Sequence, residues 1–181
     1  MQEEETHAAY PKLNLPPAEL RLRQTKGAAG NSSAATCDVF DVLRRRYVRL
    51  TPEEWVRQHF VSYLLHHKGY PAGLVGNEVS LRLNGTSRRC DTVVFGRDGA
   101  PLMIVEYKAP GVALTQKVFD QVARYNIVLR TPWLVVSNGM THACCHLDLV
   151  RQTYAFVREI PTYAELTGAR QQPVGAPGTT N

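Results

Sequence analysis

Two short apolar runs separated by a turn stand at the centre of the hydrophobic pattern. The first covers residues 89–95 and the second residues 102–108, and valine, isoleucine and aromatic residues are prominent in them. Between them lies Gly96-Arg97-Asp98-Gly99, and an Asp-Gly pair between apolar runs is a strong hairpin signal. The pattern therefore predicts two adjacent antiparallel strands.

Helical spacing predicts one helix on each side of this hairpin. Thr51 at the N-cap, Pro52 at the first helical position and Glu54 three residues after the cap mark a helix start, and we expect this helix to run to about His67. Residues 115–130 predict the second helix, whose apolar stripe comprises Val118, Val122, Tyr125 and Leu129.

Further strands are expected before and after these helices. Alternation over residues 75–83 predicts a half-buried strand, and the continuous apolar run 132–137 predicts a strand buried on both faces. Shorter strands are expected at 13–22, 37–40, 47–50, 143–149 and 153–157, with a flexible loop over 25–36. This order indicates an α/β domain with a mixed central β-sheet flanked by helices.

Length and composition favour one globular domain. The 181 residues, 44% of them hydrophobic, suffice for a single core, which we place at residues 12–163, after a flexible N-terminus at 1–11. Residues 164–181 are rich in Gly, Pro, Gln and Thr and predict a disordered tail. No apolar stretch is long enough to span a membrane and the N-terminus is acidic, so we expect a cytoplasmic protein.

Three charged residues of the predicted hairpin suggest a metal site. Side chains alternate along a strand, so Glu106 and Lys108 share a face, and antiparallel pairing brings Asp91 towards the end of the second strand. Two carboxylates then face one lysine. Hard oxygen ligands of this kind suit Mg²⁺, with Mn²⁺ as an alternative, and a lysine beside them can orient water or stabilise developing charge.

This spacing resembles the motif of the PD-(D/E)xK nuclease superfamily. Asp91, a gap of about fifteen residues and then Glu106-x-Lys108 at the end of an apolar strand carry the resemblance, although Cys90 stands where the motif has proline. The resemblance implies a restriction-endonuclease-like core: a helix, a three-strand meander that holds the site, a second helix on the sheet and a strand beside it. The structural alternative for Glu106 and Lys108 is an ordinary surface salt bridge.

The second helix narrows the resemblance. Gln121 and Tyr125 are four residues apart, and Gln-x-x-x-Tyr after Glu-x-Lys resembles the RecB-like branch, which implies that both residues support the metal site. Residues 12–163 as a whole resemble the N-terminal nuclease domain of type I restriction enzyme R subunits. The segments that carry this wider resemblance are Lys12–Pro17, Thr51–Phe60 and Asn138-Gly139.

Two further acids are candidates for the site. Glu53 shares a helix face with Val56 and Phe60, and the superfamily resemblance implies a glutamate from this first helix beside the metal. Its alternative role is a carboxylate favoured by the helix dipole. Glu78 can approach from the neighbouring strand or stand exposed on it. Glu54 is explained as the capping partner of Thr51.

Basic residues supply candidate nucleic-acid contacts. The net charge of +5 permits a polyanionic partner without requiring one. The candidates for phosphate contact are Arg44, Arg45, Arg46, Arg88, Arg89 and Lys117. A solvated turn is an equally plausible reading of the arginine triplet.

These observations favour a Mg²⁺-dependent nuclease that hydrolyses DNA phosphodiester bonds. The alternative is a catalytically inactive nucleic-acid-binding or assembly module with the same fold. No Gly-x-x-x-x-Gly-Lys-Ser/Thr motif is present, so we do not expect this chain to translocate by itself. Expected partners are DNA and either a second copy of the chain or separately encoded motor and specificity subunits.

Overall fold

A computed structural model describes residues 10–25, 36–83 and 85–168. Outside these ranges lie residues 1–9 of the N-terminus predicted to be flexible (1–11), most of the predicted loop, and residues 169–181 of the predicted tail (164–181). The elements in chain order are β1 (Leu22–Thr25), β2 (Thr36–Asp41), β3 (Arg46–Arg49), α2 (Pro52–His67), a 3-10 turn (Ala72–Leu74), β4 (Val75–Leu83), β5 (Thr86–Phe95), β6 (Pro101–Tyr107), α3 (Gln116–Leu129), β7 (Trp133–Ser137), β8 (His142–Asp148), β9 (Thr153–Val157) and α4 (Tyr163–Gly168).

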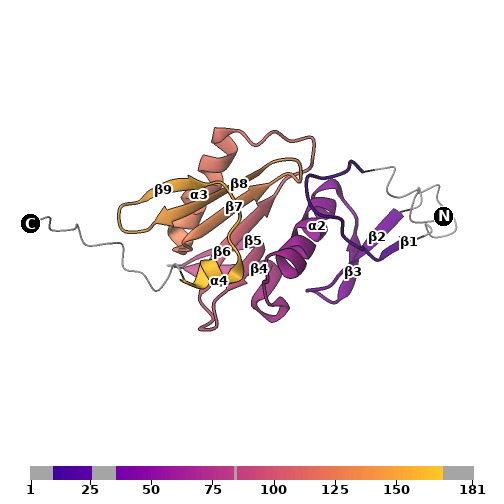
Figure 1. Cartoon of the computed structure of the whole chain (residues 1–181), viewed down its shortest axis with the longest axis horizontal. Coiled ribbons are helices and arrows are strands. Elements are labelled where there is room, and N and C mark those ends of the chain that lie inside the picture. Colours follow the sequence, from indigo (N-terminus) through magenta and orange to yellow (C-terminus); the bar gives the residue numbers. More distant parts are fainter. Residues whose placement is uncertain (1–9, 26–35, 84, 169–181) are drawn as a thin grey trace, which may run out of the picture.

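The larger of two sheets has six strands in the order β4-β5-β6-β7-β8-β9 (Figure 1). Strands β6 and β7 pair in parallel, whereas the other neighbours pair antiparallel. The predicted hairpin is present as β5 and β6, with Thr92 opposite Val105 and Val93 opposite Ile104. The predicted mixed sheet is therefore confirmed, and so is the order of helix, three-strand meander, helix and adjacent strand.

Helices α2 and α3 pack on opposite faces of this sheet. Val105 and Tyr107 of β6 lie in the same buried cluster as residues of α2, whereas Ile104 lies in a second cluster with residues of α3. Alternation along β6 separates the two sets. The face on which a β6 side chain lies therefore decides which helix it meets.

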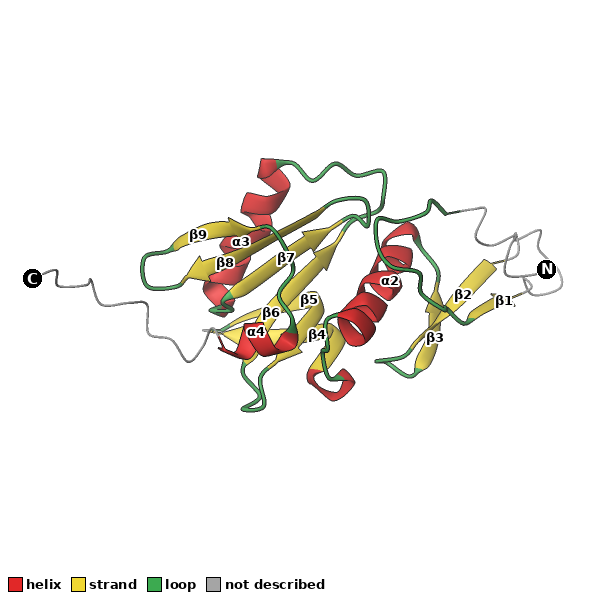
Figure 2. Cartoon of the chain, in the orientation of Figure 1, coloured by secondary structure: helices red, strands yellow, loops and turns green. Residues whose placement is uncertain are grey.

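A smaller sheet in the order β1-β2-β3 lies on the far side of α2 (Figure 2). Val39 of β2 is fully buried, and Leu22 and Val48, opposite it in register, pack against the same cluster. The predicted strand at 13–22 is wrong, since the strand begins at Leu22. The backbone of Pro16-Pro17 offers no N–H groups for a ladder.

The segment before β1 is instead held by contacts at the turn between β7 and β8. The backbone N–H of Asn14 donates to the carbonyl of Gly139 at 2.8 Å, and the Asn14 carbonyl lies 3.0 Å from Nε2 of His142. Gly139 has φ +80°, and a Cβ at this position would lie 2.7 Å from Leu13. Only glycine therefore allows the turn and the segment to approach so closely.

The C-terminal boundary differs from the prediction. Helix α4 spans Tyr163–Gly168 and buries Leu166, so the start of the tail expected at residue 164 falls inside a helix. Thr162 precedes this helix, and its backbone N–H donates to the Glu165 carboxylate at 2.7 Å. Among the described residues, no helix combines the length and apolar character that crossing a membrane requires.

Candidate functional site

The paired region of β5 and β6 ends where the predicted carboxylates stand. Thr92 and Val105 are the last pair in register at this end, so Asp91 and Glu106 are the next opposing positions. There the backbone N–H of Tyr107 donates to Asp91 Oδ2 at 2.9 Å. The Asp91 side chain thus accepts from the backbone of β6 one residue beyond Glu106.

Glu106 and Lys108 follow the alternation of β6. Glu106 is only 8% exposed and shares a side of the strand with Ile104, on the side of the sheet covered by α3. Lys108 follows directly after β6, and its backbone N–H donates to the Ser137 carbonyl at 2.9 Å. This bond belongs to the last pair of the parallel strands β6 and β7, Tyr107 and Ser137, and it holds the backbone N–H of Lys108 in place.

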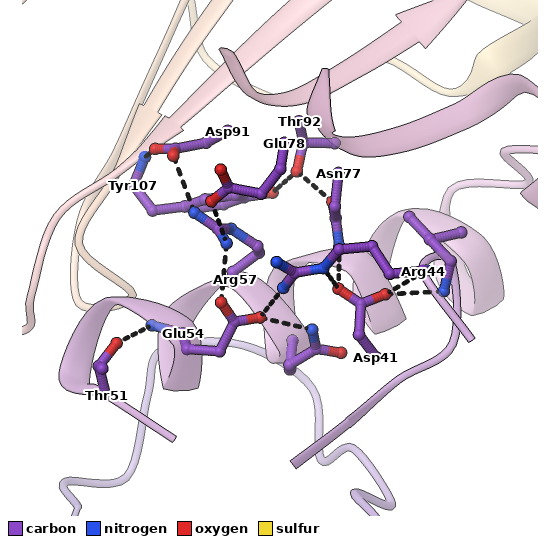
Figure 3. A network of polar contacts seen from close by, with 12 residues as sticks. Asp41, Arg44, Thr51, Glu54, Arg57, Asn77, Glu78, Asp91, Thr92 and Tyr107 are labelled. Atoms are coloured by element: carbon purple, nitrogen blue, oxygen red, sulfur yellow. Dashed lines mark hydrogen bonds and ion pairs between the residues drawn. The ribbon is translucent and has the colours of Figure 1, made fainter. Parts of the chain in front are cut away.

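A buried arginine that sequence reasoning missed lies at the centre of the polar network (Figure 3). Arg57 of α2 is 5% exposed, and its guanidinium contacts three carboxylates. The distances are 2.7 Å to Glu54 Oε2, 2.8 Å to Glu78 Oε1 and 2.8 Å to Asp91 Oδ1. Burial alone would lower the pKa of Arg57, but the carboxylates outweigh it and the pKa is raised, so Arg57 stays charged.

Glu54 rather than Glu53 is the acid that α2 turns towards the network. Thr51 caps the helix by accepting from the backbone N–H of Glu54 at 3.1 Å, as predicted. The Glu54 carboxylate, however, binds Arg57, Arg44 and Gln58 instead of returning to the cap. Glu53 is exposed, so the expectation that it points towards the protein is wrong. Both acids lie in the first turn, and the ion pairs with Arg44 and Arg57 hold Glu54 inwards.

Glu78 reaches the polar network from β4. The sequence leaves two alternatives for it, approach to the site or exposure on the strand. Its carboxylate pairs with Arg57 and also with Arg89 of β5, whose side chain is 66% exposed. Glu78 has φ +56° and lies between the register pairs Asn77–Thr92 and Val79–Cys90. A non-glycine residue in this region marks a local irregularity of the strand, which re-aims the side chain.

The polar contacts form a closed ring that starts at the hydroxyl of Tyr107 and returns to its backbone N–H. The Tyr107 hydroxyl donates to Thr92 at 3.0 Å, Thr92 donates to Asn77 at 2.7 Å, and the Asn77 amide donates to Asp41 Oδ2 at 2.8 Å. Arg44 joins Asp41 to Glu54, with contacts of 2.5 and 2.6 Å. Arg57 then joins Glu54 to Asp91, which accepts from the Tyr107 backbone.

The electrostatics of the ring are those of a buried, hydrogen-bonded network. Burial raises the pKa of Tyr107, so its hydroxyl stays protonated as a donor. Burial also pushes the pKa of Asp41 upwards, but hydrogen bonds from the Arg44 backbone, the Asn77 amide and the Arg44 guanidinium outweigh it. The pKa of Asp41 therefore lies below its ordinary value.

The donor set can be compared with what Mg²⁺ requires. Among the residues that the structure describes, no group of three or more His, Cys, Asp and Glu side chains is arranged to hold a metal ion. Asp91 and Glu106 supply two carboxylates, and Mg²⁺ is commonly held by one or two carboxylates with water and phosphate completing the shell. The oxygen donors therefore fit the ion in kind, while Asp91 Oδ1 is shared with Arg57.

The remaining predicted residues are placed as follows. Gln121 and Tyr125 lie on α3 and Arg88 lies on β5, but the side chains of these three are outside the described residues. Lys117, Arg45 and Arg46 are exposed. Arg44 is not available for phosphate, because Asp41 and Glu54 hold it.

Cysteine chemistry is not supported at the adjacent pair in β8. Cys144 and Cys145 are buried free thiols. Burial raises the pKa of each to about 12, so neither forms a thiolate readily near neutral pH.

Comparisons with known proteins place the chain in a family. Residues 52–161 match the family model of the type I restriction enzyme R protein N terminus. One similar solved structure is a fragment assigned to the HsdR subunit of a type I restriction enzyme from Vibrio vulnificus YJ016, with 19% identity and a TM-score of 0.49. The match covers 66% of this chain and 25% of that structure's chain. No curated protein matches the chain.

Proposed function

The chain belongs to the family of the type I restriction enzyme R protein N terminus, and from this premise we propose that it is a Mg²⁺-dependent nuclease that hydrolyses DNA phosphodiester bonds. The observation that carries the proposal is the hydrogen bond from the Tyr107 backbone to Asp91. It holds the Asp91 carboxylate against the backbone of Tyr107, the residue between Glu106 and Lys108, and so supports a site at this end of β5 and β6.

Each side chain has a role in the proposal. Asp91 and Glu106 would hold the ion, which when bound supplies charge that offsets the charge developing on the phosphate. Lys108 would position the attacking water or stabilise the phosphate. Glu54 replaces Glu53 as the additional acid from the first helix, acting through Arg57. Gln121 and Tyr125 are proposed to support the site, from the sequence resemblance alone.

Cleavage of labelled DNA tests this proposal. Single-stranded, duplex and branched DNAs would be incubated with Mg²⁺ or Mn²⁺ and wild type, Asp91→Asn, Glu106→Gln or Lys108→Met. We expect metal-dependent cutting that falls about 10²-fold or more in each variant, since each loses a charge at the reacting phosphate. Asp91→Asn is chosen because its amide oxygen can still accept from the Tyr107 backbone.

Glu159→Gln is the matched control, because this carboxylate is 86% exposed and its ion pair with Lys68 is long, at 3.9 Å. It should cut like wild type. Undiminished cutting by Asp91→Asn and Lys108→Met would place the activity elsewhere.

A second candidate is a nucleic-acid-binding or assembly module without turnover. It is favoured by the contact between Arg57 and Asp91 Oδ1, which engages one of the two proposed ligands in an internal ion pair. Folded wild type that binds DNA and cuts none of the panel would support this candidate. Binding to a separately encoded motor subunit is a proposal for either case.

A further inference from the structure

The outward face of the small sheet carries an unusual set of side chains. In register, Arg23 of β1, Asp38 of β2 and Arg49 of β3 form one row across the sheet. A second row on the same side consists of Arg21, which directly precedes β1, Phe40 of β2 and Tyr47 of β3. The Phe40 N–H donates to the Arg21 carbonyl, and Phe40 is opposite Tyr47 in register. We call these six residues the arginine face.

The other side of the same strands explains the fixed orientation of this face. Leu22, Val39 and Val48 alternate with the residues above and pack into the core cluster shared with α2. A slip of one residue would bury the arginines and expose Val39, so the register is strongly specified.

The positive charge of the arginine face is not neutralised. Asp38 is its single carboxylate and pairs with Arg23 at 2.9 Å. Arg21 and Arg49 are exposed and form no ion pair with any described residue. Glu19 is exposed and lines, with Arg21, Phe40 and residues of α2, a pocket at the edge of this face, and it forms no ion pair with Arg21.

Aromatic rings help to position two of the guanidiniums, one of which, Arg23, is also held by Asp38. Arg21 Cζ lies 3.8 Å from the centroid of the Phe40 ring, and Arg23 Cζ lies 4.1 Å from that of Tyr47. A stacked guanidinium keeps its charge and its N–H edges for an external acceptor, and loses little further entropy on binding. Because the guanidiniums cover these rings, the rings offer no free platform for unstacked bases. The arrangement suits phosphates.

The arginine face is connected to the carboxylate network. The turn between β2 and β3 carries Arg45 and Arg46, both exposed, and Arg44, which binds Glu54 of α2 at 2.6 Å. Asp41, at the end of β2, accepts from Asn77 of β4. The small sheet is thereby tied to both α2 and the six-stranded sheet. Residues 22–49 precede the segment 52–161 that matches the family model.

We propose that the arginine face binds the phosphate backbone of duplex DNA, without reading its sequence. The positive face meets a polyanion, and phosphate contacts position a protein on a duplex while carrying no direct base information. This inference rests on the proposed function for the choice of DNA. It assigns binding to residues outside the candidate metal site.

Salt-dependent binding tests the proposal with the full-length chain. The affinity for a short labelled duplex would be measured by fluorescence anisotropy in EDTA over about 50 to 200 mM salt. For R21Q/R23Q/R49Q we expect roughly 10²-fold weaker binding near 0.1 M salt and a salt slope smaller by roughly 3, since each phosphate contact contributes about 0.9 to the slope. Asp38→Asn should bind a few-fold more tightly, because it removes the one acid of the face.

Two variants control the experiment. R97Q/R151Q/R158Q removes the same charge from exposed arginines elsewhere and should keep most of the affinity. R21K/R23K/R49K keeps the charge of the face and should keep the salt slope. If the glutamine variant lost affinity only because its sheet misfolded, the lysine variant would lose the slope as well. An equal loss in the R97Q/R151Q/R158Q variant, wild-type binding by R21Q/R23Q/R49Q, or binding of single strands or RNA alone would each overturn the proposal.

Failure of the arginine-face proposal can be distinguished from failure of the proposed nuclease function. DNA cutting with arginine-face variants that bind like wild type would reject this surface and leave the nuclease standing. Binding that depends on the arginine face, with no cutting under any metal condition, would reject the nuclease and leave the surface.

Discussion

At the scale of single residues, Arg57 is the side chain on which the site depends most. Its guanidinium is the shared partner of Glu54, Glu78 and Asp91, and its Nε has no hydrogen-bond partner among the described residues. A buried charge can cost more in desolvation than it returns, but removing one partner leaves the others uncompensated. The network is therefore sensitive to loss of the arginine.

We expect Arg57→Met to lower the free energy of unfolding by about 3–5 kcal/mol, because three carboxylates lose their common cation. Urea unfolding at neutral pH gives the value. Arg89→Met is the matched control: it also removes a partner of Glu78, but its side chain is 66% exposed, so its loss should be about 1 kcal/mol or less. Equal effects of the two substitutions would contradict the central role of Arg57.

Asp41 should shape the acid limb of stability. Its pKa is below the ordinary value of 3.8 in the folded chain, so the unfolded chain binds a proton more readily. The stabilisation is present above about pH 4 and is lost as the pH falls through the lowered pKa. In Asp41→Asn the free energy of unfolding should be lower at pH 7 and should fall less between about pH 4 and pH 2. Denaturant titrations across this range measure the slope, and a slope equal to that of wild type would refute the assignment.

At the scale of elements, the start of α2 sets where Glu54 and Arg57 lie. Thr51→Ala removes the acceptor for the Glu54 N–H and should cost about 1 kcal/mol of stability, whereas Thr51→Ser keeps an acceptor and should cost little. If the cap also orients Glu54, DNA cutting should fall in Thr51→Ala and recover in Thr51→Ser. Thermal melting and the cleavage assay together separate the two effects.

The elements could be predicted from the sequence more completely than the site. Period-2 and period-3.6 patterns predicted β5, β6, α2 and α3, because an element that buries one face carries apolar residues at regular spacing along the sequence. Glu53 and Glu54 could not be ranked in the same way. Their neighbours are buried all round the helix, so the phase of α2 depends on contacts with β2 and β4 that spacing does not contain.

The sequence contains a signal for the role of Arg57 that the sequence analysis did not use. It is a charged residue between Val56 and Phe60, both fully buried, and charged residues in such positions are generally paired. Its position three residues after Glu54 already offered one partner. The second and third partners come from β4 and β5, which only the tertiary fold brings to the helix.

At the scale of the whole molecule, His142 links the N-terminal segment to the six-stranded sheet. Its Nε2 faces the Asn14 carbonyl and its Nδ1 lies 2.8 Å from Ser137 Oγ. A carbonyl only accepts, so Nε2 donates and the neutral ring accepts from Ser137. Burial lowers the pKa of His142, an effect that the hydrogen bond to Asn14 opposes without reversing.

The folded chain should consequently lose stability as the pH falls below about 6.5, since the unfolded chain takes up the proton more readily. We expect the free energy of unfolding of His142→Gln to depend less on pH between about 7 and 5.5. His66→Gln, at an exposed position of α2, should follow wild type. Denaturant unfolding at several pH values measures both, and identical slopes for all three proteins would exclude His142 as the group responsible.

The contact between Asn14 and the turn at Gly139 also has a consequence during synthesis. The two positions are far apart in the chain, so the segment around Leu13 cannot dock until β7 and β8 have left the ribosome. At about 5–20 residues per second, that delay is of the order of ten seconds. During this interval Leu13, Tyr10 and the ring of Trp55 on which Tyr10 stacks lack their final cover. The nascent chain therefore presents an apolar surface to chaperones until its last strands emerge.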